Sequence, residues 1–146
     1  WDAPPRDAAN AGIRPAADAD GLLELDRRAF GGPREGLLRR ILGEPGSSCQ
    51  VLYRDGRAAG YLIAREGKLG PGCAPDAAAV GGLVRAAASG AAAGTRLQVP
   101  AGGRYLDPLL AAGLRERRRL THMRLGDQVL PGERGLLLAQ ISYSAG

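Results

Sequence analysis

The sequence contains few of the residues that build metal sites, disulfides and stacking surfaces. Its 146 residues include two cysteines, one histidine and only 4 % aromatic residues. Cys49 and Cys73 show neither a Cys-x-x-Cys nor a Cys/His ligand spacing, so we expect no metal site, while a disulfide between them stays open. Because free cysteines are usually core residues, buried thiols are the simpler interpretation.

Long apolar runs are also missing. No stretch approaches the roughly 20 residues that a membrane-spanning helix needs, and the first ten residues lack the basic-then-apolar order of a signal peptide. These absences favour a cytoplasmic protein without a membrane segment. Residues 1–11 contain prolines and no apolar period, which predicts a tail or interdomain linker before a domain at residues 12–146.

Positive charge is in excess, and arginine supplies almost all of it because Lys68 is the only lysine. The formal net charge is +5, and much of the excess lies in Arg115, Arg117, Arg118, Arg119 and Arg124. Such a cluster suits a polyanion or the phosphates of a nucleotide-like cofactor. The cluster has no aromatic neighbours on which bases could stack, so we do not expect a nucleic-acid partner.

The first part of the domain predicts a strand followed by two helices. A short strand at residues 12–15 precedes a helix for which Asp18 or Asp20 is the expected N-cap. A second apolar period predicts a helix over residues 34–42.

The strongest local signal is a hairpin at Arg54-Asp55-Gly56-Arg57, where Asp-Gly joins two β-rich runs. Apolar periods and the positions of glycine and proline predict the elements that follow. They are strands at residues 49–53, 58–64 and 68–74, a helix opened by Pro75-Asp76, a strand at 95–99, a helix at 105–112, and strands at 120–125 and 136–142. The order β-α-α-β-β-β-α-β-α-β-β predicts an α/β fold with a mixed sheet.

This element order, together with several short phrases, resembles the GNAT superfamily over residues 12–143. The phrases are Ile13-Arg14-Pro15-Ala16, Asp26-Arg27-Arg28-Ala29-Phe30-Gly31-Gly32, Ala59-Gly60-Tyr61-Leu62, Gly70-Pro71, Gly113-Leu114 and Arg118-Arg119-Leu120-Thr121-His122-Met123. They are most similar to the divergent C-terminal GNAT domain of tandem bacterial acetyltransferases. The resemblance implies an N-acyltransferase family that uses acetyl-CoA or another acyl-CoA and a small amine acceptor. It also implies a second GNAT domain upstream, or a homodimer partner.

The resemblance places a cofactor site at the end of the fourth strand. An active GNAT domain splays its fourth and fifth strands around the pantetheine and then holds the pyrophosphate on an Arg/Gln-x-x-Gly-x-Gly/Ala loop through backbone N–H groups. The matching positions are Gly70, Cys73, Ala74, Ala77 and Ala78. The loop here has no basic residue and no Gly-x-Gly. Asp76, a good N-cap, would also compete with phosphates for the same donors.

The family's acid position is not matched either. Counting back from Gly113, the tyrosine that protonates the departing thiolate falls at Leu109, and an asparagine position falls near Gly102. Tyr105, one helical turn before Leu109, is therefore the candidate general acid. Alternatively, Tyr105 is an ordinary residue of an amphipathic helix with no catalytic role.

Candidate general bases are few. Glu66 follows the third strand, and His122, the single histidine, lies in a predicted strand and could titrate near neutrality. Either residue is also compatible with a plain surface role. Glu24 and Asp26 lie on the first helix, where the acceptor site of a GNAT domain would begin, although a charged helix face is usually solvated.

Three functional hypotheses follow. The chain is the cofactor-poor C-terminal half of a two-domain GNAT protein, or it is itself an acyltransferase that holds acyl-CoA through strand backbone and residues 115–119. The third hypothesis is a ligand-binding or dimerisation module that keeps the fold without catalysis.

Overall fold

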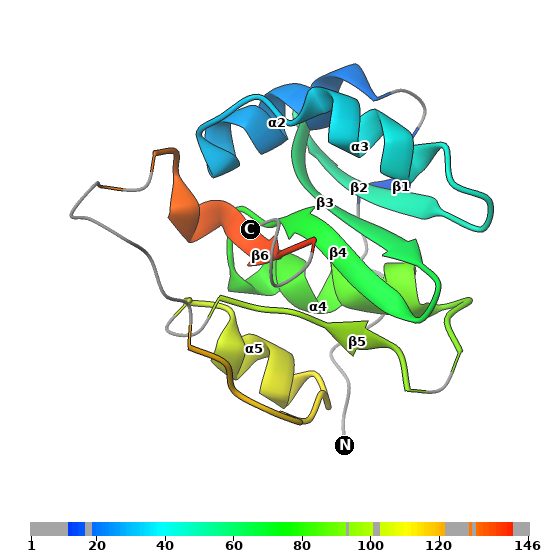
Figure 1. Ribbon diagram of the computed structural model, residues 1–146, viewed down its shortest axis with the longest axis vertical. Helices are drawn as coiled ribbons and strands as arrows, with labels where there is room; N and C mark the ends of the chain where they lie inside the picture. Colours follow the sequence, from blue (N-terminus) through cyan, green and yellow to red (C-terminus); the bar gives the residue numbers. More distant parts are fainter. Residues whose placement is uncertain are drawn as a thin grey trace.

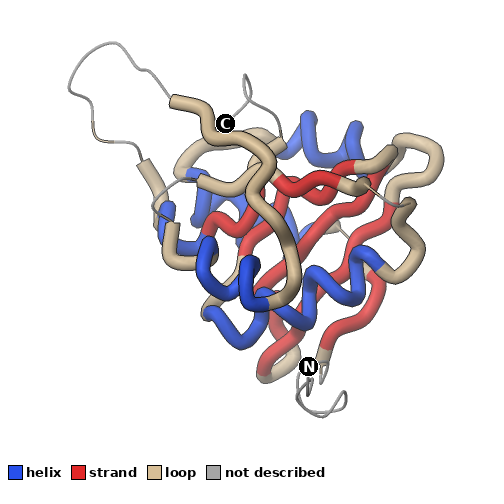
Figure 2. Tube along the Cα trace, turned by 90° about the horizontal axis from the view of Figure 1, so that it is seen from below, coloured by secondary structure: helices blue, strands red, loops and turns tan. Residues whose placement is uncertain are grey.

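A mixed β-sheet with helices on both faces forms the body of the molecule (Figure 1). This computed structural model describes residues 12–16, 19–92, 94–100, 103–121, 129 and 131–141. Helices α2 and α3 cover one face of the sheet, and α4 and α5 lie on the other. Figure 2 shows the strands running alongside one another behind the nearer helices. The expected tail at residues 1–11 lies outside the described residues.

Apart from the strand predicted at residues 120–125, the elements follow the predicted order, and the α/β fold with a mixed sheet is confirmed. They are β1 (Ile13–Pro15), α2 (Asp20–Phe30), α3 (Glu35–Leu42), β2 (Ser48–Arg54), β3 (Arg57–Arg65), β4 (Lys68–Cys73), α4 (Ala77–Ala88), β5 (Arg96–Leu97), α5 (Leu106–Ala111), a 3-10 turn (Arg134–Leu136) and β6 (Leu137–Ala139).

Two predicted details do not hold where the structure describes them. The strand expected at residues 120–125 is not formed at Leu120 and Thr121, and its other residues lie outside the described part. Leu120 is 43 % exposed, so it lacks the buried face that fixes a strand. Helix α2 begins at Asp20 and its N-cap is Ala19, which makes no side-chain capping bond, so the expected cap at Asp20 is wrong; Asp18 lies outside the described residues.

The sheet is antiparallel from β1 to β4, and β5 joins β4 in parallel through the α4 crossover. The β2–β3 turn confirms the predicted hairpin. Asp55 has a φ of 50° and Gly56 a φ of 74°, and both central residues of a type I′ turn need a positive φ.

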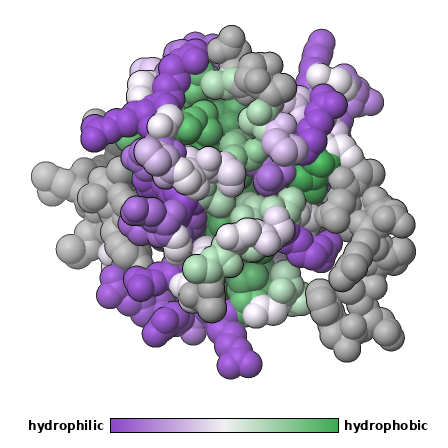
Figure 3. All heavy atoms as spheres, turned by 90° about the vertical axis from the view of Figure 1, so that its right-hand side faces the viewer, coloured by the Kyte–Doolittle hydropathy of each residue, from purple (hydrophilic) through white to green (hydrophobic). Residues whose placement is uncertain are grey.

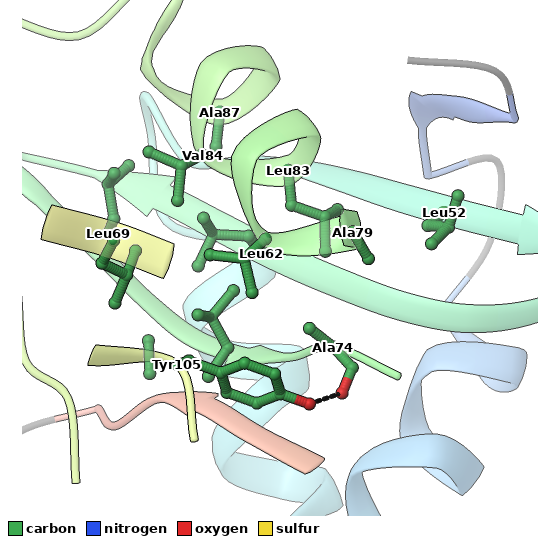
Figure 4. Packing of buried hydrophobic residues seen from close by; sticks show 13 residues of the cluster. Leu52, Leu62, Leu69, Ala74, Ala79, Leu83, Val84, Ala87 and Tyr105 are labelled. Carbon is green, nitrogen blue, oxygen red and sulfur yellow. Dashed lines mark hydrogen bonds between the residues drawn. The ribbon is translucent and has the colours of Figure 1, made fainter. Parts of the chain in front are cut away.

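The pleat of β3 divides its side chains between two cores. Leu62 packs into the core that α4 and α5 cover, which Figure 4 shows from close by. Tyr61 and Ile63 point into the core under α2 and α3. The sheet is therefore buried on both faces.

β6 lies between the two strands that the α4 crossover connects. β4 and β5 pair only at their beginnings, through Lys68↔Arg96 and Leu69↔Leu97. Beyond that point β6 pairs antiparallel with β4, next to which it is drawn in Figure 1. The chain end therefore fills the space into which β4 and β5 diverge.

The surface carries few large exposed apolar side chains. In the described part these are Leu37, Leu110, Leu120 and Val129. On the face seen in Figure 3, hydrophilic residues surround a centre where hydrophobic atoms show between them. Among the helices that the structure describes, none is long and apolar enough to span a bilayer.

Candidate functional site

The junction between β4 and α4, which we call the β4–α4 corner (residues 73–76), contains the candidate cofactor residues Cys73 and Ala74 and is flanked by the other three. Asp76 caps α4, as predicted: its Oδ1 accepts a hydrogen bond from the Ala79 N–H at 2.9 Å. Its Oδ2 accepts from Arg54 Nη1 at 2.7 Å. The bond from Arg54, followed by the backbone bonds from Ala79 and Ala78, holds the pKa of Asp76 below its ordinary value.

Tyr105 lies against this corner with its hydroxyl engaged on both sides. The O–H donates to the Ala74 carbonyl (Figure 4), and the hydroxyl oxygen accepts a hydrogen bond from Arg104 Nη2 at 2.6 Å. Arg104 Nη2 also donates to the Pro75 carbonyl at 2.6 Å. Burial raises the pKa of Tyr105. The arrangement ties the start of α5 to the corner, and a role of Tyr105 as general acid stays a prediction.

The candidate cofactor residues gather at the same corner but differ in access. Gly70, Cys73 and Ala74 are buried, whereas Ala77 and Ala78 are exposed in the first turn of α4. The edge of β4 is already paired with β6, because Gly72 pairs with Ala139 and Cys73 with Leu137.

Both cysteines are free and buried thiols. Burial raises the pKa of Cys49 and of Cys73 to about 12 in each case, so neither is a thiolate near neutral pH. In the part of the chain that the structure describes, no three His, Cys, Asp or Glu side chains gather in a way that could hold a metal.

The candidate bases are not brought to this corner. Glu66 is an exposed residue of the β3–β4 turn, beside a surface cavity of about 390 Å³. The length of β4 separates it from Cys73, which is roughly 17 Å at the rise of an extended strand. His122, like Gly102, lies outside the described residues. Both candidate roles stay predictions.

A buried polar cluster under α2 and α3 was only partly visible in the sequence. Asp26 accepts from Arg34 Nε and Nη2, each at 2.7 Å, and from the Tyr61 hydroxyl. The side chains of Arg34 and Asp26 are only 7 % and 1 % exposed. Burial opposes the charge on Arg34, yet its pKa is raised because the bonds to Asp26 outweigh that cost. Burial also raises the pKa of Tyr61 well above its ordinary range.

The signal for this cluster was the helical spacing. Leu22, Leu25, Asp26 and Ala29 stand at i, i+3, i+4 and i+7, so they share one buried face. A surface cavity of about 270 Å³ opens beside Asp26 and Arg34, between α2 and α3. Asp26 is thus a buried anchor at the rim of a cavity, rather than part of a solvated charged face.

A protein-family comparison decides what this fold belongs to. The family described as Acetyltransferase (GNAT) domain matches residues 22–139, which is most of the chain. The chain belongs to the GNAT family. No curated protein and no solved structure matches it. The resemblance seen in the sequence phrases is thereby confirmed at the level of the superfamily.

GNAT domains generally use acyl-CoA, but the residues at the corner of this GNAT domain do not fit it. The Asp76 carboxylate already occupies the N–H of Ala79 at the α4 N-terminus, where a pyrophosphate would need free donors and no negative charge. The β4 edge is paired with β6. No acyl-transfer step follows from these residues.

The acid dependence of stability tests the placement of Asp76. Asp76→Asn keeps a capping side chain but removes the charge, whereas Asp76→Ala removes the cap and is expected to cost about 1 kcal/mol of unfolding free energy. Because the folded pKa of Asp76 is lowered, its charge stabilises the fold above about pH 4 and loses that effect as the pH falls through the folded pKa. Urea unfolding between pH 2 and about 6 should show a smaller acid loss for Asp76→Asn than for the wild type. Equal acid slopes would contradict this assignment.

Proposed function

We propose that this domain is the half of a GNAT pair that does not bind acyl-CoA, and that a second GNAT domain supplies the acyl donor. The partner would be a domain upstream in a tandem protein or, as an alternative, a second copy of the chain. The observation that carries the proposal is the Asp76 carboxylate on the first turn of α4.

The electrostatics of the α4 N-terminus support this proposal. The helix macrodipole attracts an anion to its first turn, and Asp76 supplies that anion from within the chain. Two cations lie near this turn. Arg54 Nη1 is bonded to Asp76 at 2.7 Å, and Arg104 Nη2 donates to the Pro75 carbonyl and to the Tyr105 hydroxyl. A pyrophosphate approaching this turn would meet a carboxylate rather than open donors. The Ala79 N–H at the start of α4 therefore already has an anionic partner without a cofactor.

The role that remains for this half is structural or on the acceptor side. The cavity between α2 and α3 is lined by Leu23, Glu24, Asp26, Arg27, Pro33, Arg34 and Glu35. We propose that it contributes part of the pocket for a small amine. Three carboxylates line it, and an amine would have to join the arginine that each of them is paired with in this structure. The free, buried thiols are compatible with a reducing compartment such as the cytoplasm.

Titration of the isolated chain with acetyl-CoA tests the proposal. We expect no measurable heat of binding up to millimolar acetyl-CoA, with an acetyl-CoA-binding GNAT domain as the positive control. Micromolar binding would reject the proposal and favour an acyltransferase that holds the cofactor through residues 115–119. If the natural reading frame has no second GNAT domain and the chain is a monomer in solution, the pairing is also rejected.

A further inference from the structure

The C-terminal part of the described chain, residues 131–141, forms a strap that crosses from α2 to the sheet. At its start the Glu133 N–H donates to the Arg28 carbonyl at 3.0 Å, and the two side chains form an ion pair at 3.2 Å. Gly132 packs against the backbone at the end of α2, next to Gly31. Arg134 stacks on the Phe30 ring at 4.4 Å. The strap is therefore anchored on α2 before it reaches the sheet.

The residues on either side of β6 then bond to residues that directly follow β4 and β5, the two strands that border the gap. On the β4 side, the Ala74 N–H donates to the Leu136 carbonyl at 2.8 Å, ahead of the paired residues of β6. On the β5 side, the Gln140 N–H donates to the Gln98 carbonyl at 2.9 Å, and the two side-chain amides bond at 3.1 Å. Backbone groups on both borders of the gap are thus satisfied by the strap.

The side chains of β6 complete the filling. Leu138 and Ala139 belong to the core under α4, and Leu137 belongs to the core under α2. The strap also lies close to β4: a Cβ on Gly70 would come within 2.6 Å of the Gln140 carbonyl oxygen. No room remains between β4 and the strap for a second extended chain.

We propose that β6 is an internal occupant of the gap, so that docking of the strap and binding of the amide-bearing arm of acyl-CoA exclude each other. An edge strand with free N–H and C=O groups accepts an extended amide chain by strand addition. The arm would need the backbone groups of β4 that β6 now uses. This inference rests on the proposed function and names a second cause for it, separate from Asp76.

A reversible staple tests the exclusion in the full chain. Leu137 and Cys73 are register partners and face the same core. Antiparallel partners have Cα atoms about 4.5 to 5.5 Å apart, within the range that a disulfide spans. Leu137→Cys, made with Cys49→Ala to avoid mispairing, would lock the strap when oxidised and release it when reduced.

The opening variant is Gly132→Ala, which disturbs the strap where it meets α2, in an Asp76→Ala background that frees the α4 donors. We expect no acetyl-CoA binding by Asp76→Ala alone and measurable binding by Asp76→Ala/Gly132→Ala. Oxidation of the staple in that double variant should weaken binding by about tenfold or more, and reduction should restore it. Circular dichroism before each titration confirms that the variant is folded. Glu133→Arg is a milder opening variant, because it places an arginine opposite Arg28 at an exposed position.

Three outcomes would overturn the inference. The first is that Asp76→Ala alone binds acetyl-CoA as well as the opened variant does. The second is that the opened variants are folded but do not bind, and the third is that oxidising the staple leaves the affinity unchanged. Micromolar binding by the wild type would instead reject the proposed function, and the staple would still decide the inference in that protein. Hydrogen exchange of the binding-competent Asp76→Ala/Gly132→Ala variant gives a second readout. Acetyl-CoA should accelerate exchange of its Gln140 N–H, and unchanged or slower exchange contradicts displacement of the strap.

Discussion

Asp26→Asn is expected to lower the free energy of unfolding by about 3 to 5 kcal/mol, the usual cost of breaking a buried ion pair by removing one partner. The substitution keeps the size of the side chain but leaves the Arg34 guanidinium, only 7 % exposed, without its anion. It also weakens the acceptor of the buried Tyr61 hydroxyl. Urea unfolding of the purified variant, followed by far-UV circular dichroism, measures the loss.

A neighbouring acid on the same helix provides the matched control. Glu24 pairs with Arg27 at 2.9 Å, but the two side chains are 70 % and 65 % exposed. Glu24→Gln should therefore cost about 0.5 kcal/mol or less. Equal losses for the two variants would show that burial of the Asp26 pair contributes nothing to stability.

Replacing the whole cluster distinguishes an unpaired charge from lost packing. The triple variant Asp26→Leu/Arg34→Met/Tyr61→Phe removes every charged or hydroxyl group of the cluster. Because no buried charge is then left without a partner, the triple variant should be more stable than Asp26→Asn. If the triple variant is less stable than Asp26→Asn, the loss of unfolding free energy in Asp26→Asn comes from shape and packing rather than from an unpaired charge.

The elements that the sequence predicted well are those decided by nearby residues. The turn at Asp55-Gly56 follows from the positive φ that both positions adopt, and the Asp76 cap follows from a bond to an N–H three residues later. Helix bounds follow from apolar periods and from Gly31 and Gly43 at the ends of α2 and α3. These signals act within a few residues, so one sequence is enough to find them.

The position of β6 could not be predicted in this way. Its partners Gly72 and Cys73 lie far away in the sequence, and a run such as Leu136-Leu137-Leu138-Ala139 is equally compatible with several neighbours in a sheet. The engagement of Tyr105 with Ala74 is a non-local contact of the same kind. Asp26 is intermediate, because its helical spacing indicates burial while its partner Tyr61 comes from a distant strand. The candidate site thus depended mainly on contacts between distant residues.

Gly132→Ala is the second substitution with a large expected effect. We expect it either to lower the free energy of unfolding by about 3 kcal/mol or to release the strap while the rest stays folded. Gly132 has a φ of 83°, which costs a residue with a side chain roughly 1 to 2 kcal/mol. A Cβ there would also come within 2.6 Å of the Phe30 carbonyl carbon and 2.7 Å of the Ala29 oxygen, and these are backbone atoms that cannot rotate away. Urea unfolding measures the global cost, and hydrogen exchange of the β6 amides shows whether the strap separates before the rest unfolds.

Gly46→Ala separates the two contributions. Gly46 has a φ of 78°, close to that of Gly132, but a Cβ at Gly46 would have nothing within 4 Å. Its substitution should therefore cost only the same conformational penalty, roughly 1 to 2 kcal/mol, and leave exchange in β6 unchanged. The excess loss in Gly132→Ala then measures the close approach of the strap to α2. If the two variants lose equal stability, that approach contributes no stability, and the anchoring of the strap has to come from the bonds of Glu133 and of β6 itself.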